Sequence, residues 1–143
     1  MRPIKFRGKI KNNSKWVYGN LIKVDDYCCI LELDCENYGC TYLNSDDGCV
    51  DGRAVPVIPK TIGQCTGFKD GKGVEIYEGD LVALDADCVG EVYWNECMGR
   101  YDVFWKTGVD CIKHLHQIDW LNYNNARFFT VVGSIHDEVK SND

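Results

Sequence analysis

Apolar and polar residues alternate along the first part of the chain, a pattern typical of β-strands. Successive side chains of a strand point to opposite faces, so residues 4–11 form a strand with an apolar face and a basic face. The two sets are Ile4, Phe6, Gly8 and Ile10 on one face and Lys5, Arg7, Lys9 and Lys11 on the other. Residues 12–15 have the composition of a turn, and residues 16–22 form a second β-rich run. The pattern predicts an N-terminal hairpin.

Residues 27–33 form a third run whose composition suits a largely buried strand. The next stretch, residues 34–53, is polar and acidic with three glycines, and we expect a long loop there. Residues 54–58 predict a short strand at the edge of a sheet, because Pro56 has no N–H group to donate to a neighbouring strand.

The segment from Thr61 to Leu84 is punctuated by glycines. Asp70-Gly71 lies between two apolar runs and indicates a tight turn, because glycine permits positive φ. Gly79-Asp80 similarly permits a sharp entry into a strand over Leu81–Leu84. This segment predicts closely spaced strands and turns.

Three further β-rich runs cover residues 89–95, 100–105 and 127–135. Glu96–Gly99 is expected to join the first two as a hairpin. Alternation places Gly90, Val92 and Trp94 on one face, and likewise Tyr101, Val103 and Trp105 on one face. The segment Cys111–Tyr123 fits both a short helix and a strand, and we predict a helix.

Short strands and glycine-rich turns predict a mainly β fold with little helix. We expect an N-terminal β lobe over residues 1–60, containing the acidic loop 34–53. We expect a C-terminal SH3-like small barrel over residues 61–143. The two lobes are expected to form one structural unit.

The composition supports one cytoplasmic domain. The chain has 143 residues, 45% of them hydrophobic, which is enough for a sizeable core. It contains neither an apolar run of membrane-spanning length nor the apolar region of a secretory signal at its start. It contains nine cysteines, and their odd number favours reduced, mostly buried thiols over a disulfide framework.

Charge is distributed unevenly along the chain. The net charge is −6, yet residues 1–23 carry seven basic and no acidic side chains. The basic face makes Lys5, Arg7, Lys9 and Lys11 candidates for contact with a partner or with nucleic acid. The overall acidity opposes nucleic-acid binding, and a solvated or self-neutralised strand face explains the pattern as well.

Several segments resemble the YopX family of phage and prophage proteins, and they occur in the family's order. They are Ile4–Arg7, Val17–Gly19, Ile62–Gly67, Glu75–Asp80 and Val131–Ile135. The chain departs from the family at Cys65, where an aromatic residue is typical, and at Phe68, where an aliphatic one is typical. Residues 137–139 lack the usual Asn-Pro-Glu ending. The resemblance implies a β-rich protein of phage origin in the cytoplasm of a bacterial host, and it assigns no catalytic residues.

Three kinds of chemistry remain as weaker alternatives. Cys35, Cys40 and Cys49 offer three zinc ligands but no close pair, and Cys28, Cys29 or a histidine would have to supply the fourth. His114 and His116 share a face if their segment is a strand, with Asp110, Asp119 or His136 as a third ligand. A cysteine nucleophile beside a histidine is the third alternative. We assign no catalytic, metal or cofactor-binding residue and expect no cofactor.

The favoured function is therefore non-enzymatic. We expect an accessory protein that binds a phage or host protein or assembles into a homo-oligomer, because aromatic residues and strand edges are common at interfaces. Nucleic-acid binding through the basic hairpin is the second hypothesis. A metal-dependent or thiol enzyme is the third.

Overall fold

The computed structural model describes residues 4–32, 53–85, 87–106 and 118–137. Contacts between residues divide the chain into two compact units, one containing Ile4–Gln64 and the other containing Cys65–Glu138. The expected boundary lay four residues earlier, after residue 60. The expected acidic loop lies almost wholly outside the described residues.

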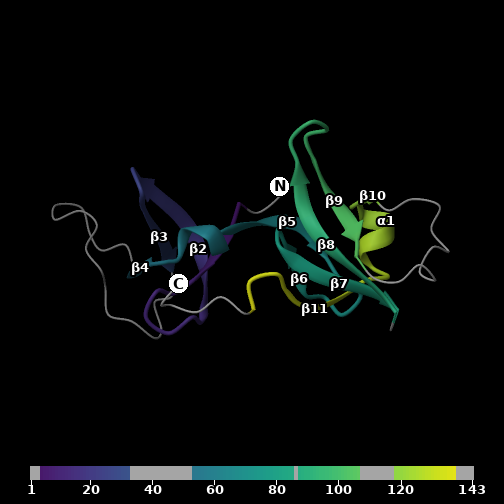
Figure 1. Ribbon diagram of the computed structural model, residues 1–143, viewed down its shortest axis with the longest axis horizontal. Helices are drawn as coiled ribbons and strands as arrows, with labels where there is room; N and C mark the ends of the chain where they lie inside the picture. Colours follow the sequence, from purple (N-terminus) through teal and green to yellow (C-terminus); the bar gives the residue numbers. More distant parts are fainter. Residues whose placement is uncertain (1–3, 33–52, 86, 107–117, 138–143) are drawn as a thin grey trace. The chain divides into compact units, whose positions relative to one another are not determined.

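The N-terminal unit is an antiparallel sheet in the order β4-β3-β2-β1-β5 (Figure 1). Its elements are β1 (Phe6–Lys9), β2 (Trp16–Val24), β3 (Tyr27–Glu32), β4 (Arg53–Pro56), the 3-10 helix η1 (Pro59–Thr61) and the start of β5 (Gly63–Lys69). The predicted hairpin is confirmed, with Lys9 opposite Trp16. Pro56 lies on the edge strand β4, as its missing N–H group predicted.

One face of this sheet forms the core of the N-terminal unit. Opposite residues of an antiparallel pair point to the same face, so the pair Gly8 and Val17 defines the inner side. A Cβ atom on Gly8 would lie 3.0 Å from the Val57 side chain, which shows how closely the chain packs here. The buried residues of this core are Val17, Cys28, Ile30, Val55 and Val57.

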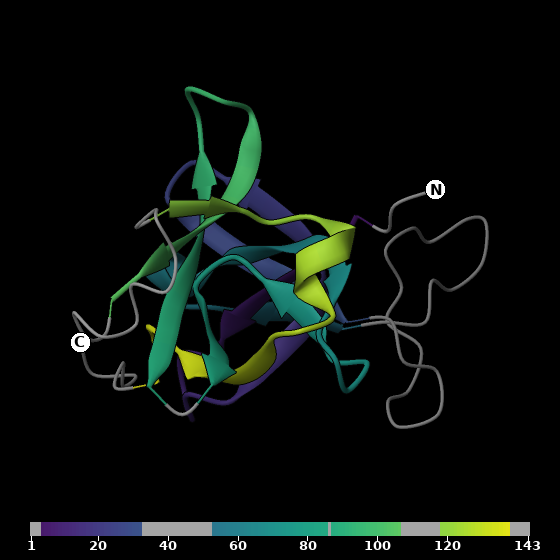
Figure 2. The same cartoon turned by 90° about the vertical axis from the view of Figure 1, so that its right-hand side faces the viewer.

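The C-terminal unit contains a five-stranded antiparallel sheet in the order β10-β9-β8-β7-β11. Its elements are the remainder of β5, then β6 (Glu75–Tyr77), β7 (Asp80–Asp85), β8 (Cys88–Asn95), β9 (Arg100–Trp105), β10 (Ile118–Trp120), α1 (Tyr123–Ala126) and β11 (Thr130–Ser134). The predicted hairpin through Glu96–Gly99 is confirmed, because Asn95 pairs with Arg100. Figure 2 shows its tip projecting, with β10 and α1 beside its base.

The second core lies on one face of this sheet. The pairs Val92 and Val103, and Trp94 and Tyr101, confirm the predicted sharing of faces. Val82, Val92 and Val103 are fully buried, and Phe68, Leu84 and Val131 pack against the cluster. The Trp105 indole donates a hydrogen bond of 2.7 Å to Asp119 on β10.

The mainly β class is confirmed. The strands of the described residues pair as open sheets. The pairing does not close a barrel, so the SH3-like barrel stays a prediction. The predicted helix over Cys111–Tyr123 is wrong at Ile118–Trp120, which pairs with β9 as a strand. The rest of that prediction up to residue 117 lies outside the described residues. In the described ranges, no helix is long and apolar enough to cross a membrane.

The short helix α1 begins after this strand because Asn122 caps it. The Asn122 side chain accepts hydrogen bonds from the backbone N–H groups of Asn124 and Asn125, at 2.9 and 3.1 Å. Asn125 accepts in return, through its side-chain oxygen, a hydrogen bond of 2.9 Å from the Asn122 backbone. This reciprocal pair is the capping box that favours a helix start.

Candidate functional site

The predicted basic face exists as a set of positions on β1. Arg7 lies opposite Tyr18 and Lys9 opposite Trp16, so these aromatic side chains share the face of the basic residues. The Arg7 guanidinium carbon lies 4.2 Å from the centre of the Trp16 ring, and Lys9 Nζ lies 5.5 Å from it. Lys11 Nζ lies 5.9 Å from the Tyr27 ring. The cations are therefore held against aromatic rings of the same sheet.

Burial changes what this face offers to a partner. Arg7 and Lys9 are only 6% and 4% exposed. Lys5 is half-buried and Lys11 is exposed. A phosphate backbone requires accessible cations, so two of the four candidate residues present little surface to one. The assignment of these residues to partner contact stays a prediction, with Lys5 and Lys11 as its accessible part.

A groove lies in the C-terminal unit, with a volume of about 390 Å³. Its lining includes aromatic residues from four strands and one basic residue, namely Phe68, Trp94, Arg100, Tyr101 and Trp120. Trp94 meets Tyr101 edge to face, with ring centres 4.9 Å apart. The β8–β9 hairpin positions Trp94, Arg100 and Tyr101, and β10 adds Trp120 beside them.

The aromatic groove leaves two indole rings open to solvent. Trp94 is 41% exposed and Trp120 is 56% exposed. The Arg100 guanidinium carbon lies 5.6 Å from the Trp120 ring centre, within the range of a cation–π contact. Large aromatic side chains on a rigid sheet are the residues that most often dominate binding energy at interfaces.

A buried carboxylate fixes the cation of the groove. Asp102 has no exposed surface, and its carboxylate accepts hydrogen bonds from Arg100 Nε and Asn95 Nδ2, both at 2.8 Å. Burial raises the pKa of nearby Tyr93, the negative charge of Asp102 adds to this, and Arg100 opposes it. The Arg100–Asp102 pair therefore sets the electrostatics of this part of β8 and β9.

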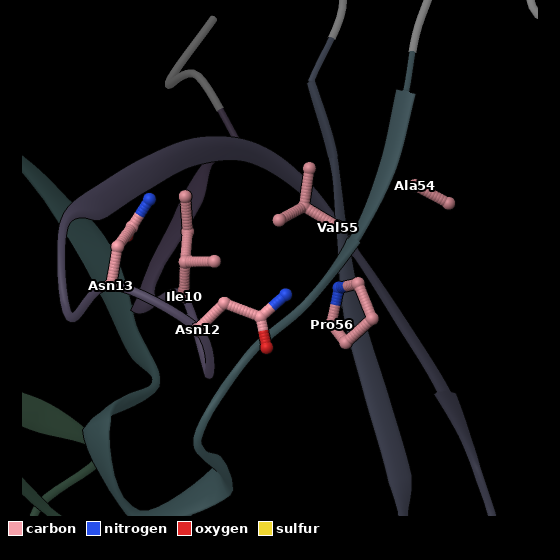
Figure 3. A pocket seen from close by; sticks show the side chains of 6 residues that line it. All are labelled: Ile10, Asn12, Asn13, Ala54, Val55 and Pro56. Atoms are coloured by element: carbon pink, nitrogen blue, oxygen red, sulfur yellow. The ribbon is translucent and has the colours of Figure 1, made fainter. Parts of the chain in front are cut away.

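Two further hollows lie in the N-terminal unit. Figure 3 shows the first, where Asn12 reaches from the turn after β1 toward Pro56 on β4. Its volume is about 270 Å³, and its lining holds no ionisable side chain. The second, of about 400 Å³, has Cys28 and Lys23 in its lining. Cys28 is 3% exposed, and the lining contains no histidine to act as a base.

The metal and thiol hypotheses receive no support from the described residues. No group of three or more histidine, cysteine or acidic side chains close enough to hold a metal occurs within them. Cys28, Cys29 and Cys65 are buried and form no disulfide, as expected, whereas Cys97 is exposed and forms none, and Cys88 is disulfide-bonded. The proposed ligands Cys35, Cys40, Cys49, Asp110, His114 and His116 lie outside the described residues.

The glycine-punctuated segment has a structural role. The Asp80 carboxylate accepts a hydrogen bond of 2.7 Å from the Tyr77 backbone, and this fixes the turn at Gly79. The Gly79 carbonyl accepts hydrogen bonds from the Ile135 backbone at 2.9 Å and the Ser134 hydroxyl at 3.3 Å. Two of the segments that resemble the YopX family, distant in sequence, therefore meet at Gly79.

Sequence reasoning missed the aromatic groove. The alternation along residues 89–105 placed Trp94 and Tyr101 correctly on their faces, and this was the available signal. The sequence does not connect Trp120 with these two residues, because the pattern around Trp120 predicts a helix. The pairing of Trp120 with Asp102 brings the second indole to the hairpin, on the sheet face opposite that of Trp94 and Tyr101.

Comparisons with known proteins give one family and one fold. The family model described as YopX protein matches residues 5–140. A crystal structure of protein EF1440 from Enterococcus faecalis is similar over 96% of both chains, with a TM-score of 0.51 and 21% sequence identity. At that identity the likeness concerns the fold. A search of curated proteins found no match.

Proposed function

The chain belongs to the YopX family, and we propose that it is a non-enzymatic protein-binding module whose contact site is the aromatic groove. The observation that supports this most is a groove of about 390 Å³ lined by two exposed indoles, Trp94 and Trp120, which belong to opposite faces of the sheet. Burying such rings against a partner removes apolar surface from water at little entropic cost, because the sheet already holds them.

The partner is expected to be a protein of the phage or its bacterial host, or a second copy of the chain. Phage origin and cytoplasmic residence follow from the family resemblance and are part of this proposal. Light scattering at several concentrations distinguishes a second copy from a different protein, because only self-association raises the apparent mass with concentration of the pure chain.

Replacing Trp120 or Trp94 by alanine is expected to weaken partner binding about tenfold or more, because exposed tryptophans at the centre of an interface contribute most of its energy. The full chain is panned against a displayed library of random dodecapeptides. The affinity of an enriched, fluorescently labelled peptide is then measured by anisotropy for the wild type and each variant.

Phe128→Ala is the matched control for non-specific binding of the peptide to exposed aromatic residues. Phe128 is 61% exposed and aromatic, but it does not line the groove. Its removal should leave peptide affinity unchanged. Equal affinity of the wild type and the two tryptophan variants would count against the groove as contact site, and a library without enriched peptides would count against protein binding altogether.

Nucleic-acid binding is the alternative, supported by Lys5 and Lys11, which flank β1 at its two ends and are less buried than Arg7 and Lys9. If it is correct, single-stranded oligonucleotides should shift in a gel at low salt, and the affinity should fall steeply as salt is raised. The double variant Lys5→Gln/Lys11→Gln should abolish the shift, while the tryptophan variants of the groove should not. We expect no shift, because the chain carries a net charge of −6.

A further inference from the structure

Strand β11 lies at one edge of the C-terminal sheet, and none of its side chains is charged. It covers Thr130–Ser134 and, among the described strands, pairs with β7 alone. Natural edge strands are protected against pairing with other chains by charged side chains, by proline or by a bulge. A register shift between Val131 and Gly133 provides a bulge in the middle of β11. The two ends of the strand need a different protection.

Asp137 closes the end of β11 at Ser134. The Ile135 N–H donates to the Gly79 carbonyl at 2.9 Å, on the side of β7, so the backbone groups of Ser134 point outward. The Ser134 N–H donates to the Asp137 carboxylate at 2.9 Å. The Ser134 carbonyl accepts from the Asp137 N–H at 3.2 Å. Asp137 thus makes both contacts that a residue of a neighbouring antiparallel strand would make.

Gly133 leaves room for the Asp137 carboxylate. A Cβ atom at Gly133 would lie 2.8 Å from Asp137 Oδ2, closer than Cβ atoms come to a neighbouring atom. The next atom, Leu81 Cδ1, would be 4.0 Å away. Gly133 is not one of the glycines with positive φ, so its backbone conformation suits alanine as well. The contact with Asp137 is therefore what favours glycine over alanine here.

The other end of β11 is closed by a turn that the unit needs. The Asp70 carboxylate accepts from the Val131 N–H at 2.9 Å, and the Gly71 N–H donates to the Phe129 carbonyl at 2.9 Å. The same carboxylate also accepts two N–H groups of its own turn. The end at Ser134 is therefore the one that can open without loss of the turn between β5 and β6.

The opposite edge of the sheet is tied to a helix. The Leu121 N–H donates to the Tyr101 carbonyl on β9, so the backbone groups of Trp120 point away from β9. The Trp120 carbonyl accepts from the side-chain amides of Asn122 and Asn125, at 3.0 and 2.7 Å. These two asparagines also form the capping box of α1. Strand addition at β10 would disturb the start of that helix, which leaves β11 as the edge that can open.

We propose that the turn over residues 134–137 is a displaceable plug, and that β11 without it pairs in antiparallel with β11 of a second copy of the chain. Identical strands pair about a two-fold axis, and uncharged ones do so without repulsion. Residues 130–132 are all β-branched, which favours strand pairing, and Val132 is already 55% exposed. This surface is not the aromatic groove, and the inference does not rest on the proposed function.

Two variants of the full chain open the plug in different ways. Gly133→Ala places a Cβ atom where the Asp137 carboxylate lies and leaves the net charge unchanged. Asp137→Pro removes both the carboxylate and the N–H group, and proline favours an extended conformation of the residue before it. Asp137→Asn is the matched control, because its amide oxygen still accepts, its N–H group still donates, and its charge equals that of the proline variant.

Sedimentation equilibrium over a range of concentrations measures the apparent mass. Both opened variants are expected to approach twice the monomer mass at concentrations where the wild type and Asp137→Asn stay lighter. Amide exchange followed by nuclear magnetic resonance at low concentration tests the plug itself. The Ser134 amide proton should exchange about tenfold faster in the opened variants, as expected when one hydrogen bond is lost.

The outcomes that would overturn the inference are distinct from those for the groove. Unchanged exchange at Ser134 in the opened variants would overturn the plug. Faster exchange with the apparent mass of Asp137→Asn throughout would overturn the pairing of two copies. Adding Val132→Lys to Gly133→Ala should restore the control mass, because two ammonium groups would meet across the axis. Association that persists in this double variant, or that Trp120→Ala abolishes, would overturn the assignment to β11.

Discussion

Replacing Asp70 by alanine is expected to lower the free energy of unfolding of the C-terminal unit by about 4 kcal/mol, because three hydrogen bonds to a charged acceptor are lost. The buried Asp70 carboxylate accepts backbone hydrogen bonds from Lys72, Val74 and Val131, at 2.8, 2.9 and 2.9 Å. It ties the turn between β5 and β6 to β11. Urea unfolding followed by circular dichroism measures the change.

The same carboxylate predicts a dependence on pH. Burial raises the pKa of Asp70. The hydrogen bonds from the N–H groups of Val131, Val74 and Lys72, together with the Lys72 charge, outweigh burial and bring the pKa below its ordinary value of 3.8. A depressed pKa stabilises the fold fully above about pH 5, and the contribution is lost as pH falls through the folded pKa.

Asp70→Asn supplies the control, since its amide keeps one acceptor oxygen but does not titrate. The difference in unfolding free energy between the wild type and Asp70→Asn should therefore be largest at neutral pH and shrink toward about pH 3. A difference that stays constant over this range would show that the charge of Asp70 contributes nothing.

Gly19→Ala is expected to destabilise the N-terminal sheet by about 3 kcal/mol or more, the range of severe overpacking. A Cβ atom at Gly19 would collide with the Leu31 carbonyl oxygen and lie 2.8 Å from its carbonyl carbon. The φ of Gly19 is 157°, which also disfavours a side chain. Relief requires β3 to move away from β2, which breaks the pairing next to Asn20 and Leu31.

Gly73→Ala is the control that separates the steric clash of an added Cβ atom from the cost of a positive φ. Gly73 has a φ of 82°, and a Cβ atom added there would meet no neighbouring atom within 4 Å. Only the conformational penalty of about 1 kcal/mol therefore remains. Urea unfolding combined with peptide-resolved hydrogen exchange reports each unit separately. If Gly19→Ala costs no more than Gly73→Ala, the close approach of β2 and β3 is not rigid.

Local turn chemistry was the part of the fold that the sequence predicted well. A turn forms at Asp70-Gly71 as expected, and the Asp70 backbone N–H donates to the Val74 carbonyl at 2.8 Å, but the glycine with positive φ in it is Gly73. The β8–β9 hairpin and its face sharing were also predictable, because the turn Glu96–Gly99 fixes the register of two alternating runs. In both cases the determining residues lie within a few positions of each other.

The candidate groove was not predictable, because it depends on contacts that are distant in sequence. Trp120 is placed by pairing with Asp102 on β9, and nothing in residues 111–123 indicated that partner. The basic strand shows the same difficulty. Alternation correctly put Arg7 and Lys9 on one face, but it does not determine whether that face is covered, and both side chains are buried.

The position of β11 also bears on the order of synthesis. β7 has β8 on one side and β11 on the other, and β11 follows it by roughly 45 residues. At ordinary ribosome speeds those residues take about 2–9 s to emerge. During that interval β7 has a nascent edge that recruits any extended strand nearby. A chaperone that binds the nascent chain early, or wider spacing of ribosomes on the messenger RNA, should therefore raise the yield of folded protein.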